Sequence, residues 1–338
     1  MRWVALLCLV GLRSLAAENG KPDTDVVNTA NATSAQPFVI LVVGAPGGAE
    51  FASNFVQQAH LWQSACATAK ADQVTIGLES GGADGATNDC ELLRQTLTRA
   101  PREGSQPLWL VFIGHGTYDG KEARFNARGP DVSASDLALW LQPLHRPLAV
   151  INTASSSAPF LNKLSGPNRV IITATRSGSE QNYARFGLYF AEAITDPAAD
   201  LDKDGAISLL EAYLAASREV AAFYKTEGRL ATEHALLDDN GDGLGTPADW
   251  FRGLRATKKA REGAALDGTL ARQFHLVPSE ADRDLSAADR ARRDALERAV
   301  LLHREKKGMM LEAEYYDELE KLLLDMARFN PSGARGGS

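Results

Sequence analysis

Residues 108–116 read Leu-Trp-Leu-Val-Phe-Ile-Gly-His-Gly, an unbroken apolar run that ends in a histidine between two glycines. A strand that is apolar on both sides is typical of a parallel sheet whose two faces are covered by helices. Residues 38–43 have the same character, and strand and helix patterns alternate from Pro37 onward. This alternation predicts an α/β fold built on a doubly wound, mostly parallel sheet with helices on both faces.

The predicted sheet and its helices occupy residues 37–199. Further strands are expected at 74–77, 147–151 and 170–174, and helices at 50–70, 89–98, 135–141 and 183–194. Residues 251–338 change character. There, a Ser286–Asp289 capping pair and a helical repeat over 311–326 predict an αα-hairpin. We expect the charged residues of this hairpin to form its solvated faces.

Residues 200–211 read Asp-Leu-Asp-Lys-Asp-Gly-Ala-Ile-Ser-Leu-Leu-Glu and meet the side-chain demands of an EF-hand calcium loop. Gly205 fills position 6, where the chain turns through a positive φ. The expected Ca²⁺ ligands are Asp200, Asp202, Asp204, the Ala206 carbonyl, Ser208 and Glu211. The alternative is an acidic turn that only opens a helix, because Ser208 and Glu211 also form a capping box.

Residues 238–249 form a second acidic turn, which would make an EF-hand-like pair over residues 200–250. Its expected ligands are Asp238, Asn240, Asp242, the Leu244 carbonyl, Thr246 and Asp249. Asp249 is one methylene shorter than the usual Glu at position 12. Residues 246–249 could instead be an N-cap, a Pro and an acid that open a helix. Apolar residues at helical spacings predict a helical connection over 211–237.

The first residues of the chain have the three parts of a signal peptide, over residues 1–17. We therefore expect a secreted or periplasmic protein, with a flexible linker at 18–36 that carries the glycosylation sequon Asn31-Ala32-Thr33. No later segment is long and apolar enough to predict a transmembrane helix. The 338 residues are 44% hydrophobic and carry a net charge of −7, which argues against a nucleic-acid partner.

Two cysteines, Cys66 and Cys90, follow the predicted signal peptide. In an oxidising compartment two thiols are expected to pair, so we predict a disulfide between them. The alternative is two buried, reduced cysteines.

Gly114-His115-Gly116 directly follows a buried strand, and the next strand leads into the polar segment 152–157. Sites in open parallel sheets lie beyond the carboxyl ends of the strands. His115 and this segment are therefore expected to face one crevice.

This arrangement resembles the legumain and caspase type (clan CD) of cysteine peptidases, in which a His-Gly ends one strand and a cysteine-bearing turn ends a neighbouring one. The legumain type fits better, because residues 44–59 and 172–180 look like that family's first strand-turn-helix and the loop after its nucleophile. The resemblance covers residues 37–194, and it implies a caspase-like fold with His115 as the catalytic histidine.

The same resemblance places Ala154 where the nucleophilic cysteine would lie. A methyl group cannot attack a carbonyl, so we expect a pseudopeptidase with a vestigial His115, acting as a binding or scaffold module with a peptide or protein ligand in the cleft. One alternative is an active hydrolase that uses Ser155 or Ser156 with His115. Another is an unrelated doubly wound fold in which calcium only holds the C-terminal helices in place.

Overall fold

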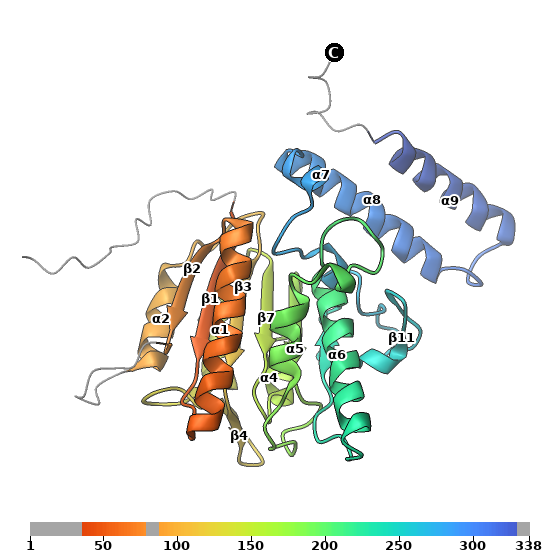
Figure 1. Ribbon diagram of the computed structural model, residues 1–338. Helices are drawn as coiled ribbons and strands as arrows, with labels where there is room; N and C mark the ends of the chain where they lie inside the picture. Colours follow the sequence, from red (N-terminus) through yellow and green to blue (C-terminus); the bar gives the residue numbers. More distant parts are fainter. Residues whose placement is uncertain (1–35, 79–87, 330–338) are drawn as a thin grey trace, which may run out of the picture. The chain divides into compact units, whose positions relative to one another are not determined.

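The computed structural model describes residues 36–78 and 88–329, which are built around a seven-stranded sheet of order β10-β9-β8-β7-β3-β1-β2 (Figure 1). Its strands are β1 (Phe38–Val43), β2 (Asp72–Ile76), β3 (Leu108–Ile113), β7 (Leu148–Asn152), β8 (Arg169–Thr173), β9 (Leu236–Asp238) and β10 (Thr246–Pro247). The pairings among β2, β1, β3, β7 and β8 are parallel, whereas β9 is antiparallel to both β8 and β10. The chain is therefore a mixed α/β structure with a mostly parallel sheet. The predicted signal peptide and the sequon lie outside the described residues.

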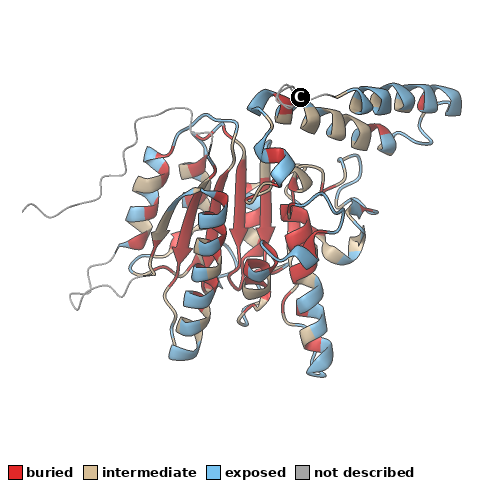
Figure 2. Cartoon of the chain, turned by 45° about the horizontal axis from the view of Figure 1, so that its top comes forward, coloured by how far each residue is buried: buried red, intermediate tan, exposed pale blue. Residues whose placement is uncertain are grey.

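The central strands are buried on both faces, as Figure 2 shows. Successive side chains of a strand point to opposite faces. Accordingly Val39 and Leu41 belong to one hydrophobic core and Ile40 and Val42 to the other. This double burial is the reason that the strands read as continuous apolar runs rather than as alternating patterns.

Three helices cover each face of the sheet. One core contains residues of α1 (Ala49–Ala69), α5 (Phe186–Ala193) and α6 (Leu209–Thr226). Trp62 of α1 stacks on Phe190 of α5, with ring centroids 6.0 Å apart. The other core contains residues of α2 (Asp89–Arg99), α3 (Ala134–Leu141) and α4 (Ala158–Leu164).

Short elements fill the connections. A three-stranded sheet of β4 (Gly116–Tyr118), β5 (Ala123–Phe125) and β6 (Val132–Ser133) lies between β3 and α3 in the sequence. The strands β11 (Phe251–Arg252) and β12 (Arg255–Ala256) pair with each other. The 3-10 turns are η1 (Pro197–Ala199), η2 (Ala248–Trp250) and η3 (Ala271–Gln273).

The C-terminal part contains α7 (Glu280–Arg283), α8 (Ala287–Glu305) and α9 (Glu312–Ala327). The Ser286 hydroxyl accepts a hydrogen bond from the Asp289 amide at the start of α8. His303 of α8 stacks on Tyr315 of α9 at 4.8 Å between ring centroids. No helix among the described residues has the length and hydropathy needed to cross a membrane.

The predicted disulfide is wrong, because Cys66 and Cys90 are both free. Cys66 lies on α1 in one core, and Cys90 lies on α2 against the other core. The sheet separates the two thiols. The spacing of the two cysteines in the sequence could not reveal their separation, because this separation depends on which face of the sheet each helix covers.

The segment between the two acidic loops also differs from the prediction. The helix α6 ends at Thr226, and the chain then returns to the central sheet as β9. The strand at residues 236–238 has only three residues. So short a segment has no sequence pattern of its own that distinguishes it from the helical spacing before it.

Candidate functional site

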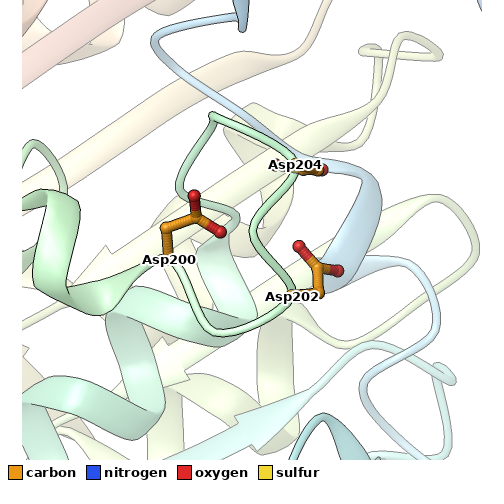
Figure 3. Close-up of side chains that lie close together, drawn as sticks. All are labelled: Asp200, Asp202 and Asp204. Atoms are coloured by element: carbon orange, nitrogen blue, oxygen red, sulfur yellow. The ribbon is translucent and has the colours of Figure 1, made fainter.

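The first acidic loop connects η1 to α6 and gathers three carboxylates. One carboxylate oxygen from each of Asp200, Asp202 and Asp204 lies within 4.8 Å of the other two (Figure 3). These are the side chains that the sequence predicts at positions 1, 3 and 5 of a calcium loop. Burial raises the pKa of the Asp204 carboxyl, and the neighbouring charge of Asp202 adds to this rise.

Hydrogen bonds from the loop backbone hold two of these three side chains in place. Asp200 accepts from the Lys203 amide at 2.6 Å and from the Gly205 amide at 3.2 Å. Asp204 accepts from the Ala206 amide at 2.8 Å. Lys203 and Gly205, at positions 4 and 6, have φ values of 63° and 87°. The glycine adopts such a φ without a steric penalty, so the loop can wrap around the carboxylates.

Glu211, the predicted position-12 ligand, lies at the base of the loop and is only 1% exposed. Its Oε1 atom accepts from the amides of Leu201 (2.7 Å) and Asp202 (3.3 Å). Its Oε2 atom accepts from the Ser208 amide at 2.9 Å and the Ser208 hydroxyl at 2.8 Å. The predicted capping box is thus present, and Glu211 joins the beginning of the loop to its end. Its carboxylate lies outside the group of three aspartates.

The second acidic loop has the same backbone conformation as the first. Asp238 accepts from the amides of Gly241 (3.0 Å) and Gly243 (3.2 Å), three and five residues further on. Asp242 accepts from the Leu244 amide at 2.8 Å. Gly241 and Gly243 have φ values of 77° and 78°. Positions 1, 4, 5, 6 and 7 therefore repeat the hydrogen bonds and positive φ values of the first loop.

The surroundings of the second loop are not those of an EF-hand. It is bounded by β9 and β10, so the helix that an EF-hand-like pair requires before this loop is missing. Asp249, the predicted position-12 ligand, is exposed on η2. The alternative helix expected from residue 246 onward is only this three-residue 3-10 turn.

Asp267 contacts the second loop from outside it and is a residue that sequence reasoning missed. It is 4% exposed, and its Oδ1 atom accepts from the amides of Asp239 (3.0 Å) and Asn240 (3.2 Å). Its Oδ2 atom accepts from the Thr246 hydroxyl at 2.5 Å. Burial, reinforced by the charge of Asp239, raises the pKa of Asp267 to about 8. No calcium-loop spacing points to a residue so far beyond the loop.

His115 follows β3 and is enclosed by aromatic rings. Its ring centroid lies 4.7 Å from that of Phe51, 5.2 Å from that of Phe55 and 6.1 Å from that of Tyr183. Its Nε2 atom lies 3.2 Å from the carbonyl oxygen of Pro46. These contacts fix the imidazole against α1.

The ends of β3 and β7 lie next to each other, as the sequence predicts. Gly116 packs so closely on the turn after β7 that a Cβ atom added to it would lie 2.3 Å from the Ser155 carbonyl oxygen and 3.4 Å from the Ala154 Cβ. Ala154 itself is 1% exposed. Ala154 is therefore a buried methyl group beside the segment that carries His115.

Neither candidate serine is hydrogen-bonded to His115 among the described residues. The Ser155 hydroxyl donates to the Gly116 carbonyl at 3.1 Å and accepts from the Gly116 amide at 3.2 Å. The Ser156 hydroxyl is buried without a hydrogen-bond partner, at a φ of 53°. A serine nucleophile needs a base within hydrogen-bond reach, and this arrangement supplies none.

Sequence reasoning also missed a pair of side chains in the loops next to β8 and β9. His234 Nδ1 and Glu180 Oε1 are 2.6 Å apart. The two residues are 54 positions apart in the sequence, so no local motif joins them.

Comparisons with known proteins give matches only at the level of structure. No protein family matches the sequence, and no curated protein matches it. The Drosophila initiator caspase Dronc aligns with a TM-score of 0.37 and 13% identity, over 71% of this chain and 95% of that chain. Caspase-1 of Spodoptera frugiperda aligns with a TM-score of 0.38 and 8% identity, over 60% and 85%. A protein of Geobacter sulfurreducens aligns with a TM-score of 0.35 and 10% identity, over 54% and 89%.

Proposed function

We propose that this chain is an exported calcium-binding protein whose caspase-like α/β part has no peptidase activity and serves to bind or hold another protein. The observation that carries this proposal is the close approach of three carboxylates, those of Asp200, Asp202 and Asp204. Three carboxylates this close together repel each other unless a cation lies between them.

The oxygen-only donor set fits Ca²⁺, a hard cation that takes six to eight oxygen ligands. Asp200, Asp202 and Asp204 would each supply a carboxylate oxygen, and Ala206 its carbonyl. Glu211 would complete the site by exchanging its hydrogen bonds with the loop amides for the ion. We expect affinity in the range of extracellular calcium modules, about 10⁻⁴ to 10⁻³ M.

The absence of peptidase chemistry rests on the turn after β7. A buried Ala154 occupies the place that the resemblance to legumain-type peptidases gives to the nucleophile, and Ser155 directs its hydroxyl to the Gly116 backbone. His115 then serves as a packed aromatic residue that shapes the surface between β3 and α1. A peptide or loop of a partner protein could occupy this surface without being cut.

Calorimetric titration of the full chain with CaCl₂, up to about 10 mM, tests the calcium proposal. We expect saturable binding by the wild type, and loss of the first-loop site in Asp202→Asn and Glu211→Gln. Glu219→Gln is the matched control, because Glu219 lies on the surface of α6, and its ion pair within the described residues is with Arg218. Absence of any heat of binding from the wild type would refute the proposal.

A further inference from the structure

Asp267 repeats in the second loop three of the four hydrogen bonds that the Glu211 carboxylate accepts in the first; the bond from the position-9 amide is made to Glu211 alone among the described residues. Glu211 Oε1 accepts from the amides at loop positions 2 and 3, which are Leu201 and Asp202. Asp267 Oδ1 accepts from the amides at the same two positions, Asp239 and Asn240. A carboxylate from outside the second loop therefore occupies the place that position 12 fills in the first.

The other oxygen of each carboxylate extends the correspondence. Glu211 Oε2 accepts from the hydroxyl of Ser208, at position 9 of the first loop, at 2.8 Å. Asp267 Oδ2 accepts from the hydroxyl of Thr246, at position 9 of the second loop, at 2.5 Å. Asn240 also donates its side-chain amide to the Ala265 carbonyl, which ties the segment before Asp267 to the loop.

One buried carboxylate oxygen of the second loop has no hydrogen-bond partner among the described residues. The Oδ2 atom of Asp242, at position 5, is buried and accepts no hydrogen bond. A buried carboxylate oxygen without a hydrogen bond is costly, and the usual compensation is a cation.

Two further carboxyl groups at this loop are buried. Asp238 is 1% exposed and Asp267 is 4% exposed. Within the described part of the chain, neither of them nor Asp242 forms an ion pair with a basic side chain. A divalent cation would stabilise the ionised form of these carboxyl groups.

We propose that the second loop is a calcium site closed by Asp267 and not by Asp249. The inference rests on the proposed calcium binding and adds a second site with a closing carboxylate from beyond the loop. Its ligands are Asp238, Asn240, Asp242, the Leu244 carbonyl and Asp267. Asp249 is exposed on η2 and has no part in closing the site.

Counting the calcium ions bound by the full chain tests this assignment. We expect two ions per wild-type chain and two for Asp249→Asn, which serves as the matched control. Asp267→Asn keeps an acceptor oxygen for the loop amides but removes the charge, so it should weaken the second site by about tenfold or more. Glu211→Gln should weaken the first site and leave the second unchanged.

A second measurement avoids any effect of a substitution on folding. Crystals of the wild type grown with CaCl₂ should contain an ion within about 2.3–2.6 Å of an Asp267 oxygen. An ion bound to Asp249 in place of Asp267, or two full-affinity sites in Asp267→Asn, would overturn the inference. Binding of a single ion, abolished by Glu211→Gln, would also overturn it while leaving the proposed function intact. No binding at all would refute both.

Discussion

Arg272 of η3 forms an ion pair with Asp202, the position-3 side chain of the first loop, with 2.8 Å between Nη2 and Oδ2. Both side chains are partly exposed, so the pair is screened by solvent. η3 also contacts the second loop, because Asp239 accepts from the Leu270 and Ala271 amides at 2.7 Å. Residues 270–272 thus connect the two acidic loops.

Replacing Arg272 by Gln should increase calcium affinity at the first loop. The guanidinium holds one oxygen of a ligand carboxylate and repels an incoming cation. An exposed ion pair contributes about 0.2–1 kcal/mol, so we expect the Kd to fall by about 1.5- to 5-fold. Calorimetry at low ionic strength measures this change. Arg218→Gln, at an exposed ion pair on α6, is the control and should leave the Kd unchanged.

Calcium should stabilise the folded chain, since an ion that binds only the native state shifts the unfolding equilibrium. At ion concentrations of one to ten times Kd, a single site adds about 0.4 to 1.4 kcal/mol to the free energy of unfolding. Thermal unfolding with CaCl₂ and with a chelator should differ accordingly for the wild type. The part of this difference that comes from the first loop should disappear in Glu211→Gln and persist in Glu219→Gln. Identical wild-type melting curves in both conditions would contradict the expectation.

Both core cysteines should react as free thiols once the chain is unfolded. Alkylation in denaturant without reductant, followed by peptide mass spectrometry, should label Cys66 and Cys90 in full. In the native state Cys66 should stay unlabelled at pH 8, because burial raises the pKa of its thiol to about 12 and leaves almost no thiolate. Cys90 is partly exposed and should react first. A peptide pair joined through Cys66 and Cys90 would contradict the structure.

Ser155→Ala and Ser156→Ala should affect stability in different ways. Losing the Ser155 hydroxyl leaves the buried amide and carbonyl of Gly116 without their partner, which costs about 1–3 kcal/mol of unfolding free energy. The Ser156 hydroxyl has no hydrogen-bond partner in the part of the chain that the structure describes, so its removal should be neutral or slightly stabilising. Urea unfolding followed by circular dichroism measures both.

The same two variants test for serine chemistry. The wild type should not cleave a peptide library, and neither should the variants. Wild-type cleavage that is lost in Ser155→Ala or Ser156→Ala would identify a serine hydrolase instead.

The central strands could be predicted from the sequence because burial on both faces leaves an unambiguous apolar run. Residues 38–43 and 108–113 form strands with the predicted bounds. The ends of α1, α2, α3 and α5 and the start of α6 agree within a few residues, since caps such as Ser208 with Glu211 have local signals, whereas the end of α6 does not. By contrast, β9 and β10 have three and two residues, and their conformation is decided by pairing, of β9 with β8 and of β10 with β9, rather than by their own sequence pattern.

The candidate site was predictable only where its residues follow one another closely. Asp200, Asp202 and Asp204 come together because a single loop carries them. Asp267 comes from a distant segment, and a rule based on spacing selects Asp249 in its place. Glu180 and His234 likewise meet only through the folded chain.

The second loop is anchored in the sheet, and this determines how it could respond to an ion. Asp238, its first side chain, is the last residue of β9 and is in register with Ile171 of β8. In calcium sensors the ion changes the angle between two helices. A loop fixed between two strands has no pair of helices whose angle an ion could change. An ion bound there would therefore stabilise the edge of the sheet without a conformational change, and it would transmit no signal.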